Sequence, residues 1–399
     1  MKNICIITQC SLPVPAVKGG AVETLVEYLI DENEKKGDYH FTVITVDDDL
    51  AKSRSKNYKY TEFVCVTKGN SFFNKILLFL YRVLKHLNIY IPFSLEFGKV
   101  LRLLKKSKRQ DLYIYEAGPT TQIPLLSKIV GKEKLYIHLH WDGMGNKRID
   151  NSFNKLIAIS DYIGKCWSEA TQCDESKIVV LPNCAKMSLF SKVVSEVEKN
   201  KLKNELNIDS GKVILFVGRI VQEKGVKELL KAVDQLNDED VCLLIVGSAN
   251  FGNKTNTPYE KEIIDLLKKT NKRIIMTGYV HHKELYKYYS IADIAVMPSM
   301  FDEPAGLVAI ETQITGTPLI ATKVGGIPEY VSDETAVLIE RDDKMIDTLK
   351  KEIKKLLSDK KKRINMSQKQ KQYVKKYNIE NYYNAFVNII DDELMKRGQ

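Results

Sequence analysis

Long hydrophobic runs are missing from this sequence of 399 residues. The longest, Ile76–Tyr81, is far shorter than the ~18 residues of a membrane-spanning helix, so we expect no such helix. The seven cysteines are scattered and form no CxxC pair, which argues against a cysteine zinc site or disulfide framework and favours reduced thiols in the cytoplasm. The N-terminal apolar stretch is also too short to predict a signal peptide.

The composition is otherwise that of a globular chain with enough apolar material for two cores. Apolar residues make up 44% of the chain and charged residues 28%, which excludes global disorder. The 61 lysines and arginines against 51 acidic residues leave a net charge of +10, which opens the surface to phosphates, anionic lipid or nucleic acid.

Short β-branched runs alternate with helical patterns along most of the chain, which predicts parallel sheets with right-handed crossovers. The runs are nearly all apolar, as expected for strands buried on both faces. They are Ile4–Thr8, Phe41–Val46, Glu62–Val66, Leu112–Tyr115, Leu135–Leu139, Leu156–Ile159 and Ile178–Leu181, then Val213–Val217, Cys242–Val246, Ile274–Met276, Ile294–Met297, Leu319–Ala321 and Val337–Ile339.

A polar, lysine-rich segment, Ala185–Asp209, separates the two series of strands. We therefore expect an α/β protein of two Rossmann-like, doubly wound domains that face each other across a cleft. Their predicted bounds are residues 1–190 and 191–375, with a C-terminal helix in 376–399 that crosses back to the first domain. Ligands bind such sheets at the carboxyl ends of the strands.

Four glycine-containing segments follow predicted strands, and together they indicate a phosphate and sugar site. Gly19 and Gly20 precede a helix start, which offers free N–H groups to an anion. Gly218 is followed by Arg219 and Lys224, a guanidinium and an ammonium that can converge on a diphosphate.

The other two segments lie further along the second half. Glu303 and Gly306 precede a predicted helix, 307–315, that carries Glu311. A carboxylate beside an anion site is costly unless it binds hydroxyl groups, and a sugar supplies them. Gly325-Gly326 forms the fourth glycine turn.

Three other patterns predict chemistry that we regard as less well supported. Asp47–Asp49 could hold a divalent cation, although a solvated turn is the better interpretation. His138, His140 and Asp142 could bind zinc, but no further histidine cluster completes a site; His281 and His282 stand alone. Glu303 and Glu311, if they share a helix, are about 12 Å apart, too far for a glycosidase pair.

The motifs together resemble the GT-B retaining glycosyltransferases of family 4. Glu303-x7-Glu311 and the GGIPE run at Gly325–Glu329 are the most specific marks. The likeness extends over nearly the whole chain, because Lys18–Glu23, Ala158–Ser160 and Leu181–Asn183 fall where the family has its GG loop, its AxS and its PN turn.

The resemblance implies a hexosyltransferase with a nucleotide-sugar donor, expected to be a UDP-sugar. It would transfer the hexose to a saccharide or lipid-linked saccharide acceptor in cell-surface polysaccharide or capsule synthesis. It implies no cofactor and no metal. The implied catalytic residues are His140, Arg219, Lys224 and Glu303. The implied donor-binding residues are Gly19, Gly20, Gly218, Tyr279, Val280, Ala305, Gly306, Leu307, Val308 and Glu311. Ala305 departs from the commoner phenylalanine, and Asn183-Cys184-Ala185 from the usual asparagine–glycine turn.

The segment 72–88 is a basic amphipathic helix in its pattern, with two readings. It can rest on an anionic bilayer at the inner face of the cell membrane, or it can pack into the core with solvated lysines. Two rival functions also remain. A sugar-nucleotide epimerase of the same fold would need no acceptor, and a nucleic-acid binder would use the positive charge, although no reading motif supports it.

Overall fold

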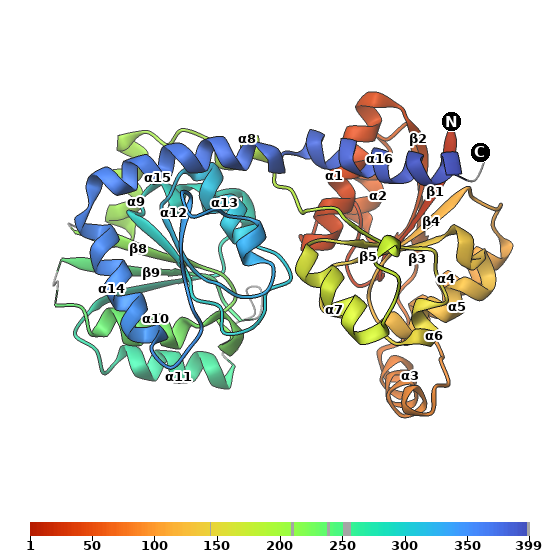
Figure 1. Cartoon of the computed structure of the whole chain (residues 1–399), viewed down its shortest axis with the longest axis horizontal. Coiled ribbons are helices and arrows are strands. Elements are labelled where there is room, and N and C mark those ends of the chain that lie inside the picture. Colours follow the sequence, from red (N-terminus) through yellow and green to blue (C-terminus); the bar gives the residue numbers. More distant parts are fainter. Residues whose placement is uncertain (144, 209–210, 238–239, 250–256, 397–399) are drawn as a thin grey trace. The chain divides into compact units, whose positions relative to one another are not determined.

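The chain forms two compact units in a computed structural model that describes residues 1–143, 145–208, 211–237, 240–249 and 257–396. Unit 1 consists of Met1–Asn183 and Ile379–Gln399, and unit 2 of Cys184–Asn378. Figure 1 shows a sheet flanked by helices in each unit. None of the described helices combines the length and apolarity that crossing a membrane requires.

Unit 1 holds a seven-stranded parallel sheet in the order β3-β2-β1-β4-β5-β6-β7. Its strands are β1 Lys2–Ile7, β2 Tyr39–Val46, β3 Thr61–Val66, β4 Leu112–Glu116, β5 Leu135–Leu139, β6 Lys155–Ala158 and β7 Ile178–Val180. Its α-helices are α1 Ala21–Lys36, α2 Asp49–Ser55, α3 Ser71–Leu84, α4 Leu95–Lys106, α5 Ile123–Val130, α6 Lys147–Asp150, α7 Asp161–Thr171 and α16 Ile379–Lys396. Short 3-10 turns are η1 Lys85–Leu87, η2 Thr120–Gln122, η3 Lys132–Lys134 and η4 Glu175–Lys177.

Unit 2 holds a six-stranded parallel sheet in the order β10-β9-β8-β11-β12-β13. Its strands are β8 Lys212–Val217, β9 Val241–Val246, β10 Arg273–Gly278, β11 Ile294–Met297, β12 Leu319–Thr322 and β13 Ala336–Ile339. Its α-helices are α8 Met187–Phe190, α9 Glu196–Glu205, α10 Val226–Asp234, α11 Pro258–Leu267, α12 Leu285–Ser290, α13 Leu307–Thr315, α14 Met345–Ser358 and α15 Lys360–Tyr373. The 3-10 turns are η5 Gln222–Lys224, η6 His282–Glu284, η7 Ile327–Glu329 and η8 Val374–Tyr377.

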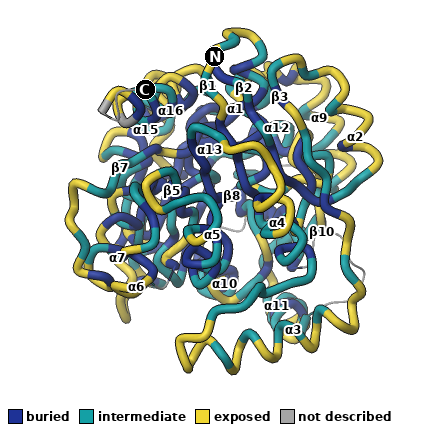
Figure 2. Tube along the Cα trace, turned by 90° about the vertical axis from the view of Figure 1, so that its right-hand side faces the viewer, coloured by how far each residue is buried: buried dark blue, intermediate teal, exposed yellow. Residues whose placement is uncertain are grey.

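Each predicted strand occurs in the structure, and the two doubly wound sheets are confirmed. The prediction works because strands covered on both faces must be apolar throughout: Leu215, Leu243 and Ile294 are fully buried. Figure 2 shows buried segments in the interior and more exposed segments around them, and the edge strands β7 and β10 are of intermediate exposure. The strand order reverses between β1 and β4 and between β8 and β11, and such a switch point is where open α/β sheets bind ligands.

Helix α16 belongs to unit 1 although it follows all of unit 2 in the sequence. The Tyr383 hydroxyl lies 2.8 Å from Asn33 Oδ1 and 2.9 Å from Asp38 Oδ2, and it can donate its one proton to either. Phe386 is 1% exposed and meets Phe41 edge-on, with ring centroids 6.3 Å apart. The last helix therefore completes the core over α1 and β2.

Candidate active site

Two loops of unit 2 are held together at the switch point between β8 and β11. The Met300 N–H donates to the Glu223 carbonyl at 2.8 Å. Gly225 has a φ of +70°, and a Cβ at this position would lie 1.8 Å from the Pro298 carbonyl oxygen. Only glycine allows the two backbones to approach so closely. The contact brings the residues after β8 against those after β11.

An ion pair between Lys224 and Glu303 lies at this junction. Lys224 Nζ is 2.5 Å from Glu303 Oε1, and the two side chains are 21% and 7% exposed. The Ser299 hydroxyl donates to the same Oε1 at 2.6 Å. Among the described residues no donor is bonded to Oε2, so this oxygen can accept from a ligand. The ammonium neutralises the buried carboxylate, which reduces the cost of placing Glu303 beside an anion.

The turn at Gly325-Gly326 fixes the backbone of Glu303. The Gly326 N–H donates to the Glu303 carbonyl at 2.7 Å. Gly325 has a φ of +54°, and a Cβ there would lie 2.3 Å from the Glu303 carbonyl oxygen. The glycine turn predicted from the sequence thus fixes the backbone that carries the Glu303 carboxylate.

Helix α13 starts directly after this loop. Gly306 is its N-cap, and Leu307 and Val308 form its first turn, whose N–H groups have no partner within the helix. Ala305, just before the cap, is half-buried and packs on a core cluster of unit 2. The helix start can therefore face an anion, as the sequence predicts.

Glu311, further along α13, is bound by His282, which corrects the expectation that His282 stands alone. His282 Nε2 lies 2.6 Å from Glu311 Oε1, and the Tyr289 hydroxyl donates to Oε2 at 3.3 Å. Burial opposes protonation of His282, but the hydrogen bond to Glu311 and its charge outweigh burial and raise the His282 pKa. Histidine spacing alone gave no signal for this pair, because its partner is 29 residues away.

The remaining predicted residues of unit 2 lie at neighbouring strand ends. Gly218 and the exposed Arg219 follow β8, and the Gly218 N–H donates to Val246 O at the end of β9. Tyr279 is 49% exposed after β10, and the half-buried Val280 follows it. All of them therefore lie at the carboxyl edge of the sheet that carries Lys224.

In unit 1, the predicted glycine loop precedes α1 as expected, with Gly20 as the N-cap. The next turn holds Glu23, which is 6% exposed. Burial raises the Glu23 pKa and the charge of Glu116 raises it further, while its own backbone N–H lowers it. The charges of Glu23, at the start of α1, and Glu116, at the end of β4, thus interact although the two residues are distant in sequence.

Glu116 joins the two histidines of β5. Its Oε2 is 3.0 Å from His138 Nδ1 and 2.7 Å from His140 Nε2. Burial opposes its ionisation, but the charges and hydrogen bonds of the histidines outweigh burial and lower the Glu116 pKa to about 2. Burial and His138 lower the His140 pKa despite Glu116. Neutral His140 then donates from Nε2, which leaves Nδ1 as an acceptor.

These three residues are also a group that could hold a metal ion, since their ligand atoms lie within 4.8 Å of one another. Asp142, which the sequence suggests as the third ligand, is exposed, and Glu116 on the adjacent strand takes that place. At Asp47–Asp49, Asp48 caps α2 and pairs with Lys18 at 2.6 Å, and Asp47 pairs with Lys52 at 2.5 Å. That segment is a capped turn.

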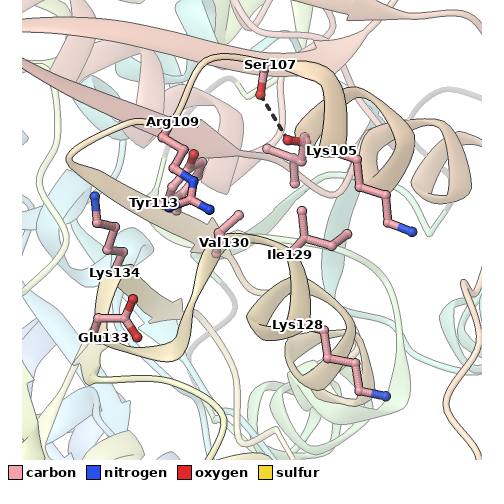
Figure 3. A pocket seen from close by; sticks show the side chains of 10 residues that line it. Lys105, Ser107, Arg109, Tyr113, Lys128, Ile129, Val130, Glu133 and Lys134 are labelled. Carbon is pink, nitrogen blue, oxygen red and sulfur yellow. Dashed lines mark hydrogen bonds between the residues drawn. The ribbon is translucent and has the colours of Figure 1, made fainter.

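A hollow of about 290 Å³ lies at the opposite, amino edge of the unit 1 sheet. Figure 3 shows it between the residues that precede β4 and β5, with Arg109 and Lys134 on one side and Lys128 below. Lys134 Nζ is bonded to the Gln110 carbonyl at 3.1 Å. The hollow therefore lies at the edge of the unit 1 sheet opposite to the edge that carries the predicted site residues of this unit.

Comparison with known proteins gives a family match in unit 2. Residues 198–373 match the model described as glycosyl transferases group 1. The lipopolysaccharide 1,2-N-acetylglucosaminetransferase of Salmonella typhimurium is 27% identical over 258 residues, which cover 63% of this chain and 65% of that enzyme. Spore coat protein SA of Bacillus subtilis is 24% identical over 344 residues, 83% of each chain.

A solved structure shows the same fold over nearly the whole chain. Anabaena HepE in complex with UDP-glucose has a TM-score of 0.75 at 17% identity, with 98% of this chain and 100% of that chain covered. These comparisons support a glycosyltransferase with the GT-B fold. The charged residues at the β8/β11 switch point of unit 2 lie where open α/β sheets bind ligands.

Proposed function

We propose that this protein is a retaining, metal-independent hexosyltransferase of family 4 type, with a UDP-sugar donor and a saccharide or lipid-linked saccharide acceptor. It would act at the cytoplasmic face of the membrane in cell-surface polysaccharide synthesis. The Lys224–Glu303 ion pair at the β8/β11 switch point supports this proposal, because a cation that can bind a diphosphate lies there beside a carboxylate that can bind sugar hydroxyls.

Departure of a nucleoside diphosphate concentrates negative charge on its terminal phosphate. Lys224, which Glu303 holds, and the first N–H groups of α13 are fixed positive groups that can stabilise this charge without reorganising, and the exposed Arg219 can add a guanidinium. Lys224 has three donors, so it can keep its bond to Glu303 and still donate to phosphate. We infer that protein groups replace the divalent cation that other transferases use.

On the sugar side, Glu303 Oε2 is the acceptor that remains for hydroxyl groups. Within unit 1, we propose His140 as a sugar-binding residue through its acceptor Nδ1, with Glu116 holding its ring. We propose that Glu311 binds the nucleotide ribose, with His282 and Tyr289 fixing the carboxylate. The complex of Anabaena HepE with UDP-glucose is the reason to expect UDP.

The decisive experiment combines donor binding with turnover. UDP-sugars should raise the melting temperature, because a ligand at 100 times its Kd adds about 2.7 kcal/mol to the free energy of unfolding. GDP- and ADP-sugars should raise it less. Lys224→Ala should reduce turnover by about 10²–10³-fold, and excess chelator should leave turnover intact. The control is Lys227→Ala, a nearby surface lysine paired with Glu262, which should stay near wild type.

Each part of the proposal has its own failure. Absence of stabilisation by any nucleotide sugar would reject the donor site. Loss of turnover with chelator, restored by a metal, would reject metal independence and direct attention to Glu116, His138 and His140. An inverted anomeric centre by NMR would reject retention, and sugar conversion without an acceptor would indicate an epimerase.

A further inference from the structure

Helix α3 leaves a large apolar surface uncovered. No residue of the helix is buried, and Figure 2 shows it as mainly exposed. Phe72 and Phe79 are each 66% exposed, and so is Leu87 in the turn that follows. The exposed apolar side chains of this surface, the α3 face, are Phe72, Phe73, Ile76, Phe79, Leu80, Val83 and Leu87. Soluble proteins rarely expose so many contiguous large apolar groups without a binding role.

The helix is attached to unit 1 by its other side. Asn74 Nδ2 donates to Glu96 at 3.0 Å, and Asn74 Oδ1 accepts from the Leu95 N–H at 2.8 Å. Tyr81 and Thr121 share a hydrogen bond of 2.8 Å between their hydroxyls. This attachment corrects the alternative in which the stripe packs into the core: polar groups fix the helix, and the apolar stripe faces outward.

The helical arrangement places cations at one border of the α3 face. At about 100° per residue, the exposed apolar side chains occupy an arc of about 120°. Lys75, Arg82 and His86 lie on the adjoining flank, and all three are exposed. Asn74 and Tyr81 lie roughly opposite the arc, in agreement with their contacts to unit 1.

The charge of the surrounding segment has one sign. Residues 67–110 contain ten lysines and arginines and a single acidic residue, Glu96, a net of +9 out of +10 for the whole chain. Glu96 is buried, where it accepts from the Gly69 N–H at 2.6 Å and from Asn74. The outer surface of this segment therefore presents cations and apolar groups together.

We propose that the α3 face is a membrane-docking surface for anionic phospholipid. Its apolar side chains enter the interfacial region of the bilayer, and Lys75, Arg82 and neighbouring cations bind the lipid phosphates. A second copy of the chain fits less well, because a two-fold interface would bring two segments of +9 together. The inference is independent of the proposed sugar transfer.

Vesicle sedimentation of the full chain tests the apolar contribution. The protein should sediment with phosphatidylglycerol–phosphatidylcholine vesicles at low salt and much less with phosphatidylcholine alone. Phe72→Ser with Phe79→Ser should weaken binding at least about tenfold, because each ring leaves the interface. The control is Leu50→Ser with Val197→Ser, at apolar side chains that are 67% and 78% exposed elsewhere.

A second pair of variants tests the charges. Lys75→Glu with Arg82→Glu should abolish sedimentation, whereas Lys360→Glu with Lys361→Glu, equal in charge change and exposed on α15, should retain it. Unchanged sedimentation of either α3 variant would overturn the proposal, and so would a dimer that the phenylalanine variant dissociates. Nucleotide-sugar stabilisation is measured without vesicles, so failure here leaves the donor site unaffected.

Discussion

At Gly225 the backbone φ of +70° coincides with a carbonyl oxygen that occupies the place of a side chain. Gly278 has nearly the same φ, +71°, but a Cβ there would meet nothing within 4 Å. A side chain would meet backbone strain at both positions but a steric clash only at Gly225. The loop that carries Lys224 depends on contact, because its close approach to Pro298 holds the ion pair in place.

We expect Gly225→Ala to destabilise unit 2 by about 2–4 kcal/mol, and Gly278→Ala by about 1 kcal/mol from backbone strain alone. Thermal unfolding followed by far-UV circular dichroism measures the difference. Both tryptophans, Trp141 and Trp167, lie in unit 1, so the tryptophan fluorescence transition should stay in place. Equal destabilisation by the two substitutions would contradict the steric argument.

The His282–Glu311 pair predicts a pH dependence. The His282 pKa is raised in the folded protein, so the pair stabilises fully below the unfolded value of about 6.5, and this contribution is lost as pH rises through the folded value. His282→Asn should therefore lower the melting temperature most at about pH 5.5 and progressively less above pH 7. A deficit that grows with pH would contradict the assigned ion pair.

Among the elements, helix α16 packs on unit 1 although it follows all of unit 2 in the sequence. Its residues Tyr383 and Phe386 cover α1 and β2, which are formed by the start of the chain. A helix that contributes buried aromatic side chains is part of the core of unit 1.

Phe386→Ala should destabilise unit 1 by about 3–5 kcal/mol, because it removes a fully buried ring. Tryptophan fluorescence during denaturant unfolding reports unit 1 alone, since Trp167 is buried there and unit 2 has no tryptophan. Met395→Ala, at a side chain that is 65% exposed on the same helix, should change little. An unchanged fluorescence transition in Phe386→Ala would show that α16 does not stabilise unit 1.

At the scale of the whole molecule, regularly repeated patterns could be predicted and pairings between elements could not. The strands were predictable because burial on both faces requires apolar residues throughout. Lys224 and Glu303 were predictable at one sheet edge, since both follow strands, but their ion pair was not. Glu116 was missed because its partners lie on the next strand, and no local pattern marks it.

The orientation of α3 was undecided for a different reason. An apolar stripe has the same sequence pattern whether protein or lipid covers it. The hydrogen bonds of Asn74 and Tyr81 determine which side faces the protein, and those bonds depend on Leu95, Glu96 and Thr121 in other elements. Such a choice requires the folded neighbours.

The position of α16 also sets the order in which the protein can fold during synthesis. The ribosome synthesises residues 184–378 before the helix that covers α1. Until then the nascent first unit exposes the surface that Tyr383 and Phe386 later bury, and it is then most open to chaperones and proteases. Unit 1 begins first and is finished last.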